Sequence, residues 1–520
     1  MRRTALFLLM GGVLLFWAGC GSQSSLTTSP VSPPVAADVP VGLTVTDTPP
    51  AGVTVLFFQV NITAASLSPG SASLLSSAVP IPINVSQLQT DLAFLGSANV
   101  PAGTYASLSV TLSNPQLTVY NGSGATIGSG GNACANGTVC QLTPSATPVT
   151  LTFSATPFPV TLLAKSPLAF MLDIHLDTVI QTDLSVNLGV TNGVTISQFP
   201  AAPAGQPIPG LGHVMGTVQS LTTDGFTLQT LDGRTFSIDV DSSTSYSYPD
   251  SVCPANDFSC VATQQIVKAE VSLQPDGTLL ASEVDYVQAA GQTVVEGSII
   301  RLSASGSNTL MDLILQEGPT QSNTLPMGRR VTVTVPASGV TYAIDSGSFT
   351  LPSGLSFASV NDLFVGQEVS VAVQGSITTA SGPGNSSPWA GIAPTTFTTN
   401  SITLEPSQLT GVVSGWSPIG MSFTLGTIPN VFMTFFGTAN ALPTLAPVNL
   451  AVQTTAQTAY TNLTPDNTAG LAVNDVISVK GWLFRYFVIP QICVADWGCA
   501  PIGEIVAETV VGRPGPTPLF

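Results

Sequence analysis

The stretch VMGTV at residues 214–218 decides the fold, because its pattern returns twice further along the chain. It recurs as VEGSI at 295–299 and as LTGVV at 409–413, each time with glycine in the third position. Self-similarity within one chain is the signature of tandem repeats. The sequence therefore predicts three copies of one unit.

Each copy continues with four further segments in which apolar residues alternate with polar or small ones, as in β-strands. Five strands in so short a unit would leave exposed edges unless the sheet closed on itself. We therefore expect three small β-barrels in tandem, at 212–290, 291–406 and 407–512. The four segments are 225–228, one closing on 244–246, 266–273 and 280–287 in the first copy; 310–315, 341–342, 366–371 and 401–404 in the second; and 422–425, 458–460, 475–479 and 505–510 in the third.

The preceding segment, 39–199, contains many short strands separated by turns, which is typical of a β-sandwich. Its residues 53–57 and 58–62 place apolar side chains on opposite parities, which predicts a bulge near Phe57 and Phe58. Residues 200–211, rich in Pro and Gly, form a linker. The predicted fold class is all-β, with an N-terminal β-sandwich followed by three small tandem β-barrel repeats.

Short motifs mark both parts of the chain. The sandwich segment carries TDTP at 46–49, PAGTY at 101–105 and LDI at 172–174. With these it resembles an uncharacterised bacterial lipoprotein domain, the domain of unknown function family forty-three eighty-two, over roughly 41–194. The first repeat carries GTV at 216–218, DGRT at 232–235 and GTLLA at 277–281. The repeats thereby resemble domain of unknown function family fifty-six sixty-six, which occurs in tandem in exported bacterial proteins. Neither resemblance implies an established activity.

The first 20 residues are typical of an export signal. Two arginines precede an apolar run at 5–18, and Gly19 stands before Cys20. The run is too short for an ordinary transmembrane helix. The segment is similar to bacterial lipoprotein signals, in which the cysteine thiol is lipidated and becomes the mature N-terminus. A plain secretory signal with a chance cysteine is the alternative.

Residues 21–38, rich in Ser, Thr and Pro, form a tether behind this cysteine, and 513–520 form a tail. We expect an exported protein whose acyl chains attach it to the bacterial membrane. The resemblance to lipoprotein signals implies the outer membrane, because Gly21 and Ser22, and no Asp, follow the cysteine.

The charge balance limits the possible partners. The chain has 11 Lys and Arg against 28 Asp and Glu, a formal net charge of −17. An acidic surface repels phosphate backbones, so we expect no nucleic-acid partner. It also opposes docking on anionic lipid, so the membrane would be held through the acyl chains alone. Nothing in the sequence predicts a cofactor.

The seven cysteines support export. Apart from Cys20 they fall into three local pairs, and an even remainder is what an oxidising compartment predicts. We expect disulfides rather than zinc sites, because the pairs lack two-residue ligand spacing and no histidine lies among them. The pairs are Cys134 with Cys140, Cys253 with Cys260, and Cys493 with Cys499.

Asp173, His175 and Asp177 share one parity of a strand whose other face is apolar. Side chains two residues apart point the same way, so an imidazole and a carboxylate could converge on one metal ion. The alternative is the solvated face of an amphipathic strand. We interpret His213, just before the first repeat, as a solvated or capping residue, and Asp47 as a turn former. The sequence contains no Gly-x-Ser-x-Gly elbow, phosphate-binding loop or His-Glu-x-x-His motif.

Aromatic residues are the other candidates for contact. Trp389, Trp416 and Trp497 lie in loop-like segments, where they suit a sugar or a protein, although each could instead cover the end of its own barrel. The most aromatic segments are 431–436 and 482–487, both in the third repeat. Because 482–487 is apolar on both faces, we predict that this repeat carries the contact surface. Its cover could be the preceding repeat, a second copy or an outside partner.

These observations predict a lipid-anchored cell-envelope protein that binds or scaffolds, with an envelope protein or a glycan as its partner. The alternative is a metal-dependent or carbohydrate-active hydrolase, since paired carboxylates need only be close in space.

Overall fold

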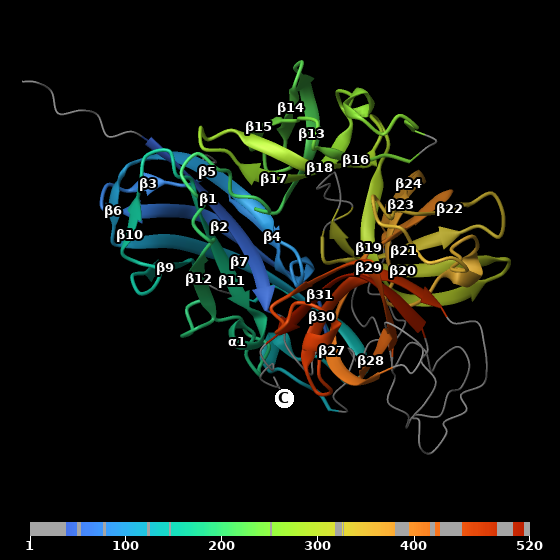
Figure 1. The fold of residues 1–520 in the computed structure, drawn as a ribbon. Helices are drawn as coiled ribbons and strands as arrows, with labels where there is room; N and C mark the ends of the chain where they lie inside the picture. Colours follow the sequence, from blue (N-terminus) through green and yellow to red (C-terminus); the bar gives the residue numbers. More distant parts are fainter. Residues whose placement is uncertain are drawn as a thin grey trace, which may run out of the picture. The chain divides into compact units, whose positions relative to one another are not determined.

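Strands account for most of the described structure, and the predicted all-β class is confirmed (Figure 1). The computed structural model describes residues 38–48, 54–75, 80–121, 125–144, 147–249, 252–317, 325, 327–379, 395–416, 422–426, 450–485 and 503–513. Several predictions fall outside these residues: those for Cys20, Trp389, Trp497, the pair Cys493 and Cys499, and the segment 431–436.

Residues 38–198 form a β-sandwich. Its elements are β1 (Asp38–Thr48), β2 (Thr54–Ser68), β3 (Ala72–Ser73), β4 (Ile81–Asn84), η1 (Val85–Gln87), β5 (Ala93–Pro101), β6 (Gly103–Tyr105), β7 (Ser107–Asn121), η2 (Gly130–Asn132), β8 (Thr138–Leu142), β9 (Val149–Phe153), β10 (Val160–Leu162), β11 (Leu168–His175), α1 (Leu176–Val179) and β12 (Val194–Gln198). One sheet has the order β12-β11-β1-β5 and continues into the first repeat through the pairing of Ala93 with His213. The other has β3-β2-β7-β8, with β4 on β2 and β9 on β7. Apolar side chains of both sheets, among them Leu43 and Leu108, meet in one core.

A bulge in β2 places Leu56 and Phe57 on one side of the sheet and Val55 and Phe58 on the other. The pairing of β2 with β7 shifts between Val55 and Phe57, which confirms the bulge expected from the sequence. Phe58 is buried in the sandwich core, whereas Phe57 is buried in a second core that the second and third repeats build. One strand therefore contributes to its own domain and to the neighbouring one.

The three repeats contain the remaining strands, most of which are labelled in Figure 1. The first has β13 (His213–Leu221), β14 (Gly225–Gln229), β15 (Thr235–Asp239), β16 (Ser245–Ser247), η3 (Phe258–Cys260), β17 (Ile266–Leu273) and β18 (Leu279–Gln288). The second has β19 (Val294–Ser305), β20 (Asn308–Glu317), β21 (Arg330–Val335), β22 (Thr341–Ile344), η4 (Val360–Asp362), β23 (Glu368–Ala372), β24 (Gln374–Thr379), β25 (Thr395–Thr398) and β26 (Ser401–Glu405). The third has β27 (Ser407–Trp416), β28 (Ser422–Gly426), β29 (Leu450–Thr461), η5 (Thr468–Gly470), β30 (Val476–Arg485) and β31 (Gly503–Arg513).

Each repeat joins its strands in a closed circuit. In the first, the pairing runs from β13 through β14, β15, β18 and β17 back to β13. The third is a closed barrel of the same order, β27-β28-β29-β31-β30. In the second, two strands of the circuit are each divided into two parts: β21 with β22, and β25 with β26. β21 pairs β25 and β22 pairs β26, and β20, β19 and β23 complete the circuit. All three repeats thus share one topology.

The marker glycine of the first strand allows this strand to cross the second at close range. A Cβ on Gly216 would lie 2.4 Å from the Gln229 carbonyl oxygen, and one on Gly297 would lie 2.5 Å from that of Ile314. No side chain fits there, which explains why the glycine recurs.

The repeats also share a turn before their fourth strand. A one-turn 3-10 helix is followed by a residue with positive φ and then by Gln or Asp, whose side chain accepts a hydrogen bond from the N–H three residues earlier. The second and third copies, whose sequences match the first only weakly, therefore have the same turn as the first. The three sets are Gln264 (φ 69°) with Gln265 and Ala262 (2.8 Å), Gly366 (φ 93°) with Gln367 and Phe364 (2.7 Å), and Asn474 (φ 77°) with Asp475 and Ala472 (2.6 Å).

The aromatic strand of the third repeat is covered by the second repeat. Trp482 is 2% exposed; its indole N–H donates to the Asp345 carbonyl (2.6 Å), and its ring lies 5.0 Å from that of Phe349. Leu483 and Phe484 are buried as well. Of the three covers considered for this strand, the structure shows the preceding repeat for 482–484, so these residues are not a surface for an outside partner.

Candidate functional site

The two cysteine pairs that the structure describes form disulfide bonds, as predicted. Cys134–Cys140 encloses the turn before β8, and Cys253–Cys260 closes the loop before β17.

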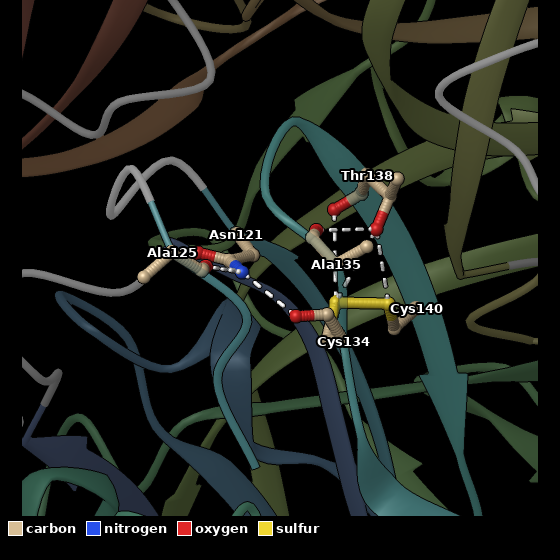
Figure 2. The surroundings of a disulfide bond; sticks show 6 residues. All are labelled: Asn121, Ala125, Cys134, Ala135, Thr138 and Cys140. Carbon is tan, nitrogen blue, oxygen red and sulfur yellow. Dashed lines mark hydrogen bonds between the residues drawn. A yellow bond between two sulfur atoms is a disulfide. The ribbon is translucent and has the colours of Figure 1, made fainter.

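Hydrogen bonds hold the first disulfide loop in place. Figure 2 shows the Asn121 amide donating to the carbonyls of Ala125 (2.7 Å) and Cys134 (2.8 Å). The Thr138 hydroxyl donates to the Ala135 carbonyl (2.6 Å). The loop's polar groups are thus used internally, which indicates a structural role.

Asp173 and His175 lie side by side at the end of β11. The His175 Nε2 is 3.7 Å from the Asp173 Oδ2 and 3.1 Å from the Thr195 hydroxyl. The strand ends at His175, and α1 begins with Leu176, so the alternation that would bring Asp177 to the same face stops there. Among the described residues, no three His, Cys, Asp or Glu side chains are placed to hold a metal ion. The structure therefore does not assemble the predicted trio as a metal site.

Asp47 is a buried residue of β1, and its interpretation as a turn former is wrong. Its side chain is fully buried, and neither carboxylate oxygen has a hydrogen-bond partner. Burial raises its pKa well above the usual range; nearby Arg513 opposes this, and Asp173 and Asp177 add to it. The TDTP and LDI motifs meet here because β1 runs parallel to β11, with Thr46 opposite Asp173.

Lys480 of β30 joins the third repeat to the sandwich. Its Nζ lies 3.1 Å from the Asp91 Oδ2 and 3.5 Å from the Glu508 Oε2, and Lys480 and Asp91 are each 21% exposed. Burial is the largest single effect and opposes charge on both groups, but their mutual attraction, together with Lys268 near Asp91 and Glu508 near Lys480, outweighs it. The pKa of Asp91 therefore falls below its usual value, and that of Lys480 rises above its own.

Neutral side chains of β27 hold the same sandwich segment. Gln408 donates from its amide to the Gln87 carbonyl (2.6 Å) and accepts from the Thr90 N–H (3.1 Å). The Thr410 hydroxyl donates to the Gln89 side chain (2.9 Å). These bonds fix the position of Asp91 opposite Lys480.

Lys480 and Asp91 belong to a larger set of charged side chains to which the sandwich and all three repeats contribute. We call this set the central charged cluster. It includes two of the three lysines in the whole chain. Its members, linked by electrostatic interactions, are Asp91, His213, Lys268, Glu270, Glu283, Asp285, Glu296, Glu317, Asp345, Glu368, Glu405, Lys480 and Glu508.

Several carboxyl groups of the cluster hold their protons to unusually high pH. Burial raises the pKa of Glu270 to about 7, with Asp91 adding to the effect, although the Gly212 N–H donates to its Oε1 (3.2 Å). Burial and the neighbouring Glu317 raise the pKa of Glu296 to about 7. Glu368 accepts from the Ser298 hydroxyl (2.6 Å), and burial still raises its pKa well above the usual range. The cluster can therefore take up and release protons near neutral pH.

Sequence reasoning missed this cluster and misplaced one of its members. The sequence indicates a solvated or capping His213, but burial, opposed by Asp91, lowers its pKa to about 3. A signal for the cluster exists in the aligned repeats. Val267 pairs with Gly216 as Ile477 pairs with Gly411, so Glu270 and Lys480 occupy the same position of the unit with opposite charges.

Of the three predicted contact tryptophans, the described backbone includes only Trp416, the last residue of β27. Trp389 and Trp497 lie outside the described residues. No helix among the described residues has both the length and the apolar character needed to cross a membrane.

Two family models match parts of the chain. Domain of unknown function (DUF4382) matches residues 39–190, and Domain of unknown function (DUF5666) matches residues 215–285. No curated protein matches the chain. The chain is thus similar to DUF4382 in its sandwich and to DUF5666 in its first repeat, and its second and third repeats share the topology of that first repeat.

Proposed function

We propose that this protein is a lipid-anchored scaffold of the bacterial cell envelope that binds partners without catalysing a reaction. One observation carries the proposal: polar and charged side chains connect the sandwich to all three repeats within the compact unit 37–520. Domains joined by linkers alone move independently, whereas domains joined by such contacts present fixed surfaces.

The contacts between sandwich and second repeat support this rigidity. The Asn84 amide donates to the Gln316 carbonyl (2.9 Å), and the Gln316 amide donates back to the Leu56 carbonyl (2.6 Å). The side chains of Thr118 and Gln141 both donate to the Gly328 carbonyl, at 2.7 and 2.6 Å. Paired donors and acceptors of this kind fix one orientation of the two domains.

The sequence supports the anchor. Cys20 follows the apolar run, and the tether 21–38 would span up to roughly 50 Å if largely extended, which holds the folded domains off the lipid. We place the partner contacts, with an envelope protein or a glycan, on the segments of Trp389, Trp416 and Trp497. The outer membrane is the proposed location.

Fractionation of cells tests the anchor. We expect wild type in the membrane fraction and Cys20→Ser in the soluble fraction. If wild type is soluble as well, the anchoring proposal fails.

Crosslinking in intact envelopes, followed by purification, tests the scaffold. We expect wild type to retain specific envelope partners or glycan, and Lys480→Met, which loosens the third repeat, to lose them. Lys165→Met is the matched control, because Lys165 is the lysine outside the central charged cluster and is exposed. Turnover of a polysaccharide by the purified protein, with metal added or chelated, would contradict the non-catalytic role.

A further inference from the structure

We propose that a hollow on the second repeat binds a neutral saccharide. The hollow has a volume of about 420 Å³, within the size range of small-molecule sites. Strands β21, β24 and β25 supply its lining. The lining residues are Thr334, Gln374, Gly375, Ser376, Thr378, Thr396, Phe397 and Thr398.

A break in strand pairing creates the hollow. Gln374 pairs with Thr398 and Thr378 with Thr396, so three residues of β24 stand opposite the single residue Phe397 of β25. The surplus residues must arch away from the sheet, as in other bulged strands. Gly375 has φ +72°, a conformation that side chains other than glycine's rarely adopt, and it allows the arch to begin. The space left open lies over Phe397, which is 4% exposed and belongs to the core below.

The hollow is an addition to the common repeat. In the first repeat, β17 and β18 follow each other with a short turn between Leu273 and Leu279. In the second, β24 is inserted between β23 and β25, which with β26 forms the split equivalent of β18. The circuit of the barrel closes without β24, so this inserted strand is free to serve another purpose.

The lining selects for a ligand without charge. Six of its side chains carry a hydroxyl or amide, and none is charged. In the described part of the chain, the side chains of Gln374, Ser376, Thr378 and Thr398 make no hydrogen bond, while Thr396 donates to the Thr378 carbonyl (3.4 Å). A charged ligand would find no counter-charge among these side chains.

Sugars match this lining because each sugar hydroxyl both donates and accepts, as do the Ser, Thr and Gln groups facing it. The inference deepens the proposed binding role by naming a ligand class and a site. It does not require the Cys20 anchor or an envelope protein partner.

Titration of the purified mature protein with neutral oligosaccharides tests the site. Cellohexaose, maltohexaose, laminarihexaose and mannohexaose would be the probes, with polygalacturonate as the charged comparison. We expect at least one neutral probe, and not polygalacturonate, to bind. Thr378→Val with Thr398→Val, which removes two hydroxyls and keeps the side-chain shape, should weaken binding at least tenfold.

The matched control is Thr150→Val, an exposed threonine of β9 in the sandwich, which should bind as wild type does. Thermal unfolding of each variant shows whether the fold is retained. The proposal is overturned if no neutral probe binds wild type, or if the folded double variant binds with unchanged affinity. Retained crosslinked partners in that case would leave the scaffold role intact.

Discussion

Gly328 of the second repeat lies against the ring of Phe57 of the sandwich. A Cβ on Gly328 would be 2.3 Å from the Phe57 Cδ1, and Gly328 also has φ +68°. The Gly328 carbonyl accepts from Thr118 and Gln141 of the sandwich, so the backbone cannot retreat without breaking those bonds. The interface between the sandwich and the second repeat therefore requires glycine, with no side chain, at Gly328.

We predict that Gly328→Ala lowers the free energy of unfolding by about 2–4 kcal/mol, through backbone strain and overpacking against Phe57. Chemical denaturation measures the change. Gly354→Ala is the control, because Gly354 has φ +94° but no atom within 4 Å of its Cβ position, so that variant suffers the strain alone. Equal losses in both variants would contradict the proposed contact with Phe57.

The ion pair of Lys480 with Asp91 leads to a second prediction. Lys480→Met leaves the carboxylates of Asp91 and Glu508 without their cation, so we expect a loss of about 2–4 kcal/mol in unfolding free energy. Lys165→Met should change it by less than about 0.5 kcal/mol, because Lys165 is exposed. Urea unfolding compares the two. A loss of the same size in both variants would show that the location of the lysine is irrelevant.

The raised carboxyl pKa values predict that stability falls as pH rises. Glu296 has a folded pKa of about 7 against a usual value of 4.5, so the folded state binds the extra proton between these values. Its contribution is present at pH 4.5 and is lost by pH 7. Glu270, with the same values, adds to the trend. His213 opposes it, since its folded pKa of about 3 against 6.5 makes stability rise with pH over that range.

Melting temperatures from pH 4.5 to 7.5 measure this balance. Because several carboxyl groups oppose one histidine, we expect the wild-type temperature to decline over the range. The decline should be shallower in Glu296→Gln and steeper in His213→Asn. If Glu296→Gln has the wild-type slope, Glu296 does not titrate in this range.

Intact-mass measurement tests the cysteine pairing. The mature protein should show six thiols protected from alkylation until it is reduced: those of Cys134, Cys140, Cys253, Cys260, Cys493 and Cys499. Each bond should stabilise the fold by about 2–3 kcal/mol, because it restricts the unfolded chain. Alkylation of the cysteines at 134, 140, 253 or 260 without reduction would contradict the pairing in the structure.

Local patterns predicted the strands well, because alternation depends on neighbouring residues. The five strands of the third repeat and the bulge near Phe57 are of this kind, whereas β21, β24 and β25 of the second repeat were not predicted. Which residues pack on the face of a strand depends on the whole fold and not on neighbouring residues in the sequence. Alternation shows that Phe57 and Phe58 point in opposite directions, but only the fold shows that Phe57 enters a core of the repeats.

The central charged cluster could not be predicted for a related reason. Asp91 and Lys480 are 389 residues apart, and each looks like an ordinary surface charge in its own segment. The residues around His213 likewise do not indicate that Asp91 lies near it in the fold. When the repeats are aligned, Glu270 and Lys480 fall at one position, and this is the clearest indication of the cluster in the sequence.

The pairing of Asp91 with Lys480 has a consequence for the order of assembly. A chain made from its N-terminus presents the sandwich long before β30 exists. Each repeat closes from strands that are near in sequence, so it can form as soon as its fifth strand arrives. Until the second and third repeats have formed, Asp91 of the sandwich lacks its lysine partner and the ring of Phe57 is uncovered. We therefore expect the oldest part of the nascent protein to be the last to mature, and to need the most protection from aggregation while it waits.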